Sequence, residues 1–414
     1  MASEPTSTGP EPIIFDGWRS ISIALYMALV GYTVMSVVPV LSTALVGLAG
    51  FTEEQVGRVW GADLGGLSLG AFLSAFLVAR INRRALVFAG VILSISGNAL
   101  CLVFVDYEQV MWLRVATGIG SGIFTAVAVV SLGGTTNPAR AFILLMIAFA
   151  FSTAGELHFL PQLSMHEIYL FFIGLSVVCL CFLHWIPTRP LNTEELAVQD
   201  QGDAGEGGEA ENWHVPKFLS LMCLTAVCFT YINIGGYYTY IELAAHADGV
   251  ADEWMGPILT WSSIFIIVGS AIAYLCTRFG LFKPLFISLA CMAGIVMMLS
   301  GGITEINVMV SLFGFMTLWT FVDVYQSAMI SHMDRSGVLV ALLPSVQGFG
   351  QFVGPNVAAS VIGAGLGYPI MFMVSGSMAL VAMGLYIGVF LFMHRRQHLG
   401  PTQPSYSSPE PSAE

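Results

Sequence analysis

The chain has 414 residues, of which 56% are hydrophobic and only 10% are charged. A water-soluble domain needs far more polar surface than this composition supplies, so a soluble globular protein is excluded. The net charge of −12 comes without any basic patch, and we therefore expect no nucleic-acid partner.

Apolar runs long enough to cross a bilayer follow one another along the chain. A transmembrane helix needs about 20 apolar residues. Six such runs lie near 20–46, 55–79, 85–105, 109–132, 140–162 and 167–186, and six more lie near 217–241, 255–276, 284–303, 306–330, 337–362 and 368–393. The sequence therefore predicts an all-α membrane protein with twelve transmembrane helices.

An acidic, glycine-rich segment separates the two sets of six runs, and its composition is typical of a flexible, solvated tether. Two sets of six suggest an internal repeat, with a substrate site between two pseudo-symmetric six-helix bundles. The predicted organisation is a disordered cytoplasmic N-tail (1–19), an N-terminal bundle (20–187), an acidic cytoplasmic linker (188–216), a C-terminal bundle (217–393) and a disordered cytoplasmic C-tail (394–414).

The positions of the basic residues predict the orientation. Lys and Arg near helix ends stay on the cytoplasmic side of the membrane. If both termini are cytoplasmic, twelve of the 14 Lys and Arg residues fall on that side, and the two others are Arg58 and Arg114. We therefore expect a multi-pass protein of a bacterial inner membrane with both termini in the cytoplasm.

Four ionisable residues fall inside the predicted spans: Asp63, Arg114, Glu156 and Asp323. Such residues are costly in hydrocarbon and are functional candidates by default. Arginine keeps its charge, so Arg114 needs a carboxylate or an anionic substrate. Glu156 and Asp63 both lie near its depth, and an acid released from Arg114 would take up a proton. The alternative is a permanent ion pair that holds the bundle together, and the choice of partner stays open.

Two motifs resemble signatures of the major facilitator superfamily. The loop after the second run matches the arginines of the pattern G-x-L-A-D-R-x-G-R-R at Arg80, Arg83 and Arg84, whereas Ala79 replaces its aspartate. The pattern R-x-x-x-G-x-G of proton-coupled members is met by Arg114, Gly118 and Gly120 in the fourth run.

A third signature, the exporter pattern G-x-x-x-G-P of the fifth run, is broken, because Glu156 follows Gly155 where proline would stand. Its intact form, Gly350, Gly354 and Pro355, lies in the eleventh run. The arginine pattern is nearest to that of the drug and metabolite antiporters, which use proton exchange.

The resemblance implies a secondary active transporter that works by alternating access and binds a small molecule between its bundles. Proton coupling is assigned to Arg114, Glu156 and Asp63, and a gate loop to Arg80, Arg83, Arg84 and Arg278. Aromatic faces with hydrogen-bonding tips suit a small amphipathic organic molecule. The candidate substrate residues are Asp323, Trp319, Gln326, Tyr237, Tyr238, Asn233, Tyr32, Tyr26, Gln347 and Gln351.

Export of the substrate is the favoured direction, and proton-linked uptake of an organic acid is the first alternative. A membrane sensor or accessory subunit that binds a ligand without moving it is the second. The sequence has no P-loop, HExxH or GxSxG motif, so we expect neither ATP-driven transport nor an enzyme. No metal site and no cofactor are expected, and the partners are the substrate, protons and the lipid bilayer, with the chain acting as a monomer.

Overall fold

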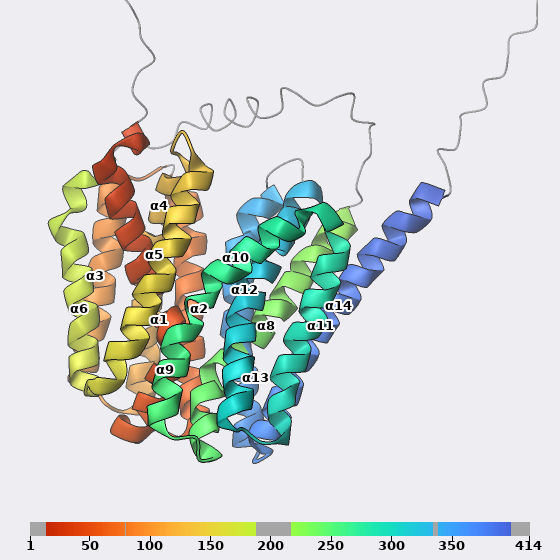
Figure 1. Cartoon of the computed structure of the whole chain (residues 1–414). Coiled ribbons are helices and arrows are strands. Elements are labelled where there is room, and N and C mark those ends of the chain that lie inside the picture. The colour runs from red at the N-terminus through yellow and green to blue at the C-terminus, as the bar shows by residue number, and fades with distance from the viewer. Residues whose placement is uncertain (1–13, 79, 188–216, 334–337, 399–414) are drawn as a thin grey trace, which may run out of the picture.

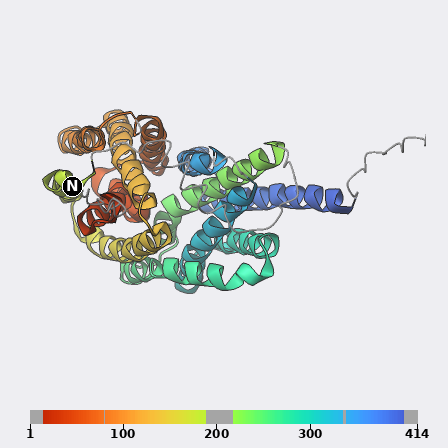
Figure 2. The same ribbon diagram turned by 90° about the horizontal axis from the view of Figure 1, so that it is seen from above.

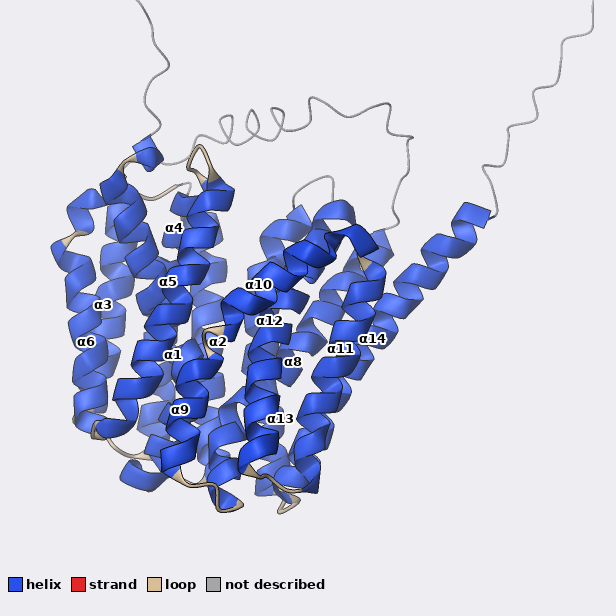
Figure 3. Cartoon of the chain, viewed as in Figure 1, coloured by secondary structure: helices blue, strands red, loops and turns tan. Residues whose placement is uncertain are grey.

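The computed structural model describes residues 14–78, 80–187, 217–333 and 338–398, and within these ranges every regular element is a helix (Figure 3). The predictions for the linker 188–216, and for most of the two tails, lie outside the described residues. Helices are the expected outcome for an apolar chain in lipid, because each backbone N–H and C=O must find its partner within the chain.

Helices occupy all twelve predicted positions. The first six are α1 (Trp18–Ala49), α2 (Glu53–Leu77), α3 (Arg83–Cys101), α4 (Tyr107–Gly133), α5 (Pro138–Phe159) and α6 (Met165–Cys181). The others are α8 (Lys217–Ala247), α9 (Asp252–Ser262), α10 (Phe265–Cys276), α11 (Phe282–Met297), α12 (Glu305–Met333), α13 (Val338–Gly363) and α14 (Gly367–His398). The pair α9 and α10 fills one predicted span, which is interrupted between Ser262 and Phe265. The prediction of an all-helical fold with twelve helices is confirmed.

Ten of these positions hold helices that are long and apolar enough to cross a membrane, as judged over the described residues. The other two positions hold α6, an apolar helix of 17 residues, and α13, which has 26 residues and contains Pro344 and Pro355. The chain is therefore a multi-pass integral membrane protein.

Local sequence explains where the helices end. Gly50 adopts a φ of 71° directly after α1, a left-handed conformation that glycine reaches without strain. The Thr52 hydroxyl then accepts a hydrogen bond from the Gln55 N–H at 3.2 Å, and the Gln55 side chain accepts one from the Thr52 N–H at 3.0 Å. This reciprocal cap starts α2, and Ser164 with Glu167 starts α6 in the same way.

Helices α1 to α6 gather on one side of the molecule and α8 to α14 on the other (Figures 1 and 2). The turns after α1, α3, α5, α8, α11 and α13 all lie at the end of the molecule opposite the start of α1, and we call this the distal end. The two sides meet where α2 packs on α13, α1 on α8, and α5 on α9 and α10. A site between the two sides can therefore draw on these helices and on their immediate neighbours.

Candidate functional site

The charge of Arg114 is neutralised inside the first group of helices. Its Nε donates a hydrogen bond to Oδ2 of Asp63 at 2.7 Å, and its Nη2 lies 2.5 Å from the same oxygen. Its Nη1 donates to Oδ1 of Asn98 at 2.8 Å, and its Cζ lies 5.6 Å from the centre of the Trp60 ring. Both side chains of the ion pair are fully buried. Between the two partners that the sequence left open, Arg114 is thus paired with Asp63.

Close packing of α2 on α4 brings the two charges together. Gly118 of α4 packs directly against the backbone of α2. A Cβ added at Gly118 would lie 2.9 Å from the Leu67 nitrogen. At Gly66, on the facing helix, an added Cβ would lie 3.0 Å from the Ile119 nitrogen. Only small residues let two helix backbones approach so closely. The glycine of the R-x-x-x-G-x-G pattern therefore sets the distance across which Arg114 reaches Asp63.

Glu156 lies apart from this ion pair and is held by hydroxyl groups. Ser152 donates to its Oε1 at 2.9 Å, Thr33 donates to Oε1 at 3.3 Å, and Ser36 donates to Oε2 at 3.1 Å. The residue is only 9% exposed, and within the described ranges no basic side chain forms an ion pair with it. An ionised carboxylate in such a place is costly, and protonation is the simplest way to neutralise it.

A small cavity connects the surroundings of Arg114 and Glu156. Arg114, Asn98 and Ser121 line it from one side, and Thr33, which donates to Glu156, lines it from α1. Its volume of about 20 Å³ has room for one water molecule with several polar neighbours. The ion pair of Arg114 and Asp63 is therefore not bonded to Glu156, but the cavity lies between Arg114 and Thr33, a hydrogen-bond donor to Glu156.

Asp323 of α12 is the corresponding lone carboxylate of the second group of helices. Its Oδ1 accepts hydrogen bonds from the Tyr231 hydroxyl at 2.8 Å and from Nε2 of Gln347 at 2.6 Å. The residue is half-buried, and no described lysine, arginine or histidine forms an ion pair with it. An anionic group held by a tyrosine and a glutamine thus lies in α12, beside the junction of the two sides.

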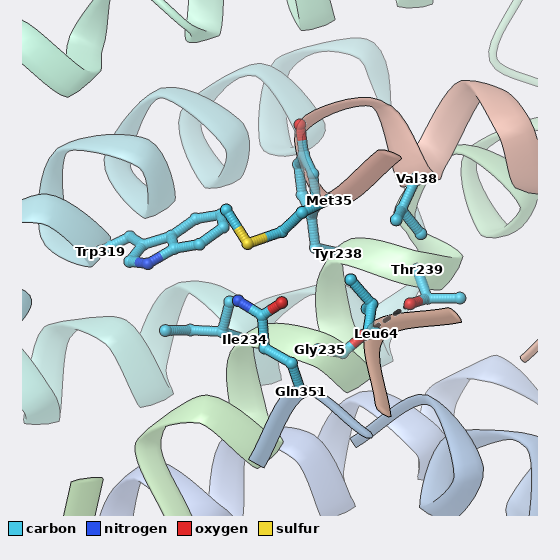
Figure 4. Close-up of a pocket in the computed structure, with 9 residues that line it drawn as sticks. All are labelled: Met35, Val38, Leu64, Ile234, Gly235, Tyr238, Thr239, Trp319 and Gln351. Atoms are coloured by element: carbon cyan, nitrogen blue, oxygen red, sulfur yellow. Dashed lines mark hydrogen bonds between the residues drawn. The ribbon is translucent and has the colours of Figure 1, made fainter. Parts of the chain in front are cut away.

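A pocket opens between the two sides next to this region (Figure 4). Figure 4 shows the Trp319 indole and the Gln351 amide pointing into the same space, from α12 and α13 respectively. The hydroxyl of Tyr238 crosses the junction and donates to the Ser36 carbonyl at 2.8 Å. The complete lining is Met35, Val38, Leu64, Ile234, Gly235, Tyr238, Thr239, Trp319 and Gln351. Three of the ten predicted substrate residues therefore line this pocket, and Asp323 and Gln347 form the adjacent polar cluster together with Tyr231. The Tyr32 ring packs against Phe149, with 6.3 Å between the ring centres.

The other four predicted substrate residues are used in packing between helices. Tyr237 is fully buried, with its hydroxyl 2.8 Å from Oγ of Ser311. Gln326 donates to Thr230 at 2.7 Å, and Tyr26 donates to the Leu175 carbonyl at 3.0 Å. Asn233 is fully buried, and neither polar atom of its amide has a hydrogen-bond partner in the described part of the chain.

Three of the four predicted gate-loop arginines contact residues of their own group of helices or of the segments that flank it. Arg84 donates to the carbonyls of Ile186 at 2.7 Å and His184 at 2.6 Å. Arg83 is fully buried beneath the Phe15 ring, whose centre is 4.8 Å from its Cζ. Arg80 is exposed, and Arg278 is exposed with its Cζ 4.8 Å from the centre of the Phe279 ring.

The prediction for one acid is corrected by the structure. From its place at the outer end of its span, Glu242 is expected to be a solvated gate or rim residue, yet it is only 6% exposed. The sequence did carry a signal for this burial. Glu242 stands four residues after Tyr238 on the same helix, and residues at this spacing share a helix face.

Comparison with known proteins identifies the family of this multi-pass membrane protein. The sequence profile of the Major Facilitator Superfamily matches residues 23–355, so the chain belongs to this superfamily of transporters. No curated protein sequence matches the chain.

Solved structures of transporters share the fold at low sequence identity. A D-xylose-proton symporter has a TM-score of 0.68 and 12% identity, over 89% of this chain and 97% of the symporter. The nucleoside transporter NupG has a TM-score of 0.65 and 12% identity, over 89% and 98% of the two chains. The human organic anion transporter MFSD10 (TETRAN) has a TM-score of 0.64 and 14% identity, over 89% and 99%. At these identities the likeness concerns the fold alone.

Proposed function

We propose that this transporter is proton-coupled and moves a small amphipathic organic molecule by alternating access, with export as the direction. The observation that carries the proposal is the pair of buried or half-buried carboxylates, Glu156 and Asp323, that have hydrogen-bond donors but no cationic partner in the described chain. One would exchange protons and the other would bind substrate.

The proposed architecture is two pseudo-symmetric six-helix bundles, 20–187 and 217–393, joined by the tether 188–216. The distribution of Lys and Arg supports cytoplasmic termini, which makes the distal end external, and a bacterial inner membrane is the proposed location. Contacts between the bundles near that end include Tyr240 donating to the Glu53 carbonyl at 2.8 Å and Arg58 donating to Ser360 at 3.2 Å. These contacts would close the external side and must break when the substrate is released outwards.

Glu156 is the proposed coupling carboxylate. Asp63 is neutralised by Arg114, so its charge is already balanced and gains little from a proton. Glu156 is surrounded only by hydroxyl groups, which can stabilise either its protonated or its ionised form. Two of those hydroxyls belong to α1, which also packs on α8. A change in the charge of Glu156 would thus act on the helix that lies between the bundles.

The polar cluster of Asp323, Tyr231 and Gln347 suits an organic cation. An anionic group in an aromatic setting attracts a positively charged nitrogen through both charge and ring faces. Trp319 and Tyr238 in the adjoining pocket would hold the apolar part of the molecule. Uptake of an organic acid is less well supported, because Arg114, its candidate anion ligand, is engaged by Asp63 and Asn98.

Transport in liposomes tests the proposed function. Purified protein is reconstituted, pH gradients of either sign are imposed, and ethidium, tetraphenylphosphonium and benzoate are offered as two cations and one anion. The proposal expects the liposomes to accumulate an organic cation when the proton gradient drives protons out of them, because the two move in opposite directions. Accumulation of benzoate with protons, or ligand binding without any flux, would support the uptake or sensor alternative instead.

A further inference from the structure

A series of ionisable side chains lies along one face of α8 at the junction of the two sides. Tyr238, Glu242 and His246 are spaced four residues apart, so each stands about 6 Å further along the same face of the helix. The series begins beside Glu156 and ends at the distal surface.

The outer end of the series reaches water. Nε2 of His246 lies 3.0 Å from Oδ1 of Asp252, the first residue of α9. The Asp252 side chain is 90% exposed and that of His246 is 26% exposed. The exposed Asp252 carboxylate therefore links the buried Nε2 of His246 to the distal solution.

Glu242, the middle residue of the series, is buried, and one of its two carboxylate oxygens lacks a hydrogen-bond partner in the described chain. Its Oε2 has no hydrogen-bond partner within the described chain, whereas buried carboxylate oxygens normally have one. Thr43 of α1 offers it a hydroxyl, and the charged group that faces it from α9 is Asp252. The titratable neighbours on its own helix are Tyr238 and His246, one turn away on either side. No described arginine or lysine forms an ion pair with Glu242, so nothing holds it in one charge state.

The inner end of the series touches the hydroxyls that hold Glu156. The Tyr238 hydroxyl donates to the Ser36 carbonyl at 2.8 Å, and the Ser36 hydroxyl donates to Oε2 of Glu156 at 3.1 Å. Tyr238 is close enough to sense the charges of both Glu242 and Glu156. Tyr238 and Ser36 therefore lie between the two carboxylates at the α1–α8 contact.

We propose that His246 and Glu242 form a proton route between the distal surface and Glu156. The imidazolium of His246 gives its N–H proton to a Glu242 oxygen, and Glu242 then gives this proton to the Tyr238 hydroxyl as that hydroxyl releases its own proton to the Ser36 hydroxyl. The Ser36 hydroxyl in turn releases its own proton to Glu156, with which it is already hydrogen-bonded. Each transfer breaks one bond to hydrogen and forms one, and Glu242 returns to the carboxylate. The route rests on the proposed role of Glu156 as the proton-exchanging group.

The route is tested without any substrate by time-resolved infrared spectroscopy after a pH jump. Protonated carboxylic acids absorb apart from carboxylates, so the Glu156 and Glu242 bands are assigned by their loss in Glu156→Gln and Glu242→Gln. In Glu242→Gln we expect the Glu156 band to rise at least about tenfold more slowly than in the wild type, because the relaying group is gone. Glu242→Asp is expected to restore much of the rate, and Glu54→Gln, which changes an exposed carboxylate at the same end, should leave it unchanged.

Two outcomes contradict the proposal in different ways. A Glu156 band that rises in Glu242→Gln as fast as in the wild type overturns the route and leaves the role of Glu156 intact. A wild-type protein in which Glu156 exchanges no proton between pH 4 and pH 10 overturns the coupling role and the route together. Thermal unfolding of each variant identifies any slowing that comes from a damaged fold.

Discussion

Arg114 and Asp63 form a fully buried ion pair in which Nη2 and Nε of the guanidinium lie 2.5 Å and 2.7 Å from the same carboxylate oxygen. The pair joins α4 to α2, and α2 in turn packs on α13 of the other side. A neutral pair at this place anchors the helix that meets the second group of helices. Glu156, whose charge is not balanced by a basic side chain in the described chain, is therefore the residue to which we assign the proposed proton exchange.

Breaking the ion pair should destabilise the protein. Asp63→Asn leaves the Arg114 charge buried and uncompensated, and we expect a loss of about 3–5 kcal/mol in the free energy of unfolding. The double variant Asp63→Asn, Arg114→Gln should recover part of this loss, because it removes both charges. The measurement is unfolding of the purified protein in detergent, arranged as a double-mutant cycle.

The control for this cycle is Glu54→Gln, which breaks the partly exposed pair between Glu54 and Arg58. It should change the free energy of unfolding by about 0–1 kcal/mol. Equal losses in Asp63→Asn and Glu54→Gln would contradict a structural role for the buried pair.

The contact between α2 and α4 should not tolerate a methyl group. In Gly118→Ala the new Cβ would lie 2.9 Å from the Leu67 nitrogen, and the obstacle is backbone that cannot rotate away. We expect a loss of about 1–3 kcal/mol, typical of overpacking. Gly155→Ala is the matched control in a neighbouring helix, since nothing lies within 4 Å of its added Cβ. Comparable thermal stability of the two variants would show that this crossing is looser than described.

Asp323 should decide the affinity for organic cations. Asp323→Asn keeps the shape of the side chain and removes its charge, so binding of ethidium should weaken by about ten- to a hundredfold, or 1.4 to 2.7 kcal/mol. Tyr237→Phe changes a residue of the same predicted set whose hydroxyl is directed to Ser311, and it should leave the affinity unchanged. Fluorescence titration of both variants checks this, and a reversed order of effects would move the substrate site away from the Asp323 cluster.

Much of the fold followed from the sequence because the lipid imposes it. The described helices α1 to α6 and α8 to α14 stand where the apolar runs predicted them, whereas the break between α9 and α10 near Ser262 was missed. That break has no proline or charged residue at the interruption itself, so hydropathy carried no signal for it.

The site was less accessible to sequence analysis, because hydropathy gives depth but not direction. Asp63 and Glu156 were equally good partners for Arg114 by depth, and the choice depended on the α2–α4 contact that glycine permits. Tyr237 and Tyr238 are adjacent in sequence, yet one packs on Ser311 and the other crosses to Ser36. Which neighbouring side chain faces the pocket depends on how helices rotate about their axes, and tertiary packing decides that rotation.

Proton movement during substrate exchange is the most direct test of the account. A pH-sensitive dye is trapped in liposomes that contain the wild type or Glu156→Gln, and proton flux is recorded when ethidium is added. The account predicts that the wild type moves protons against the organic cation, whereas Glu156→Gln exchanges the cation without moving protons. Proton flux in Glu156→Gln equal to that of the wild type would contradict it.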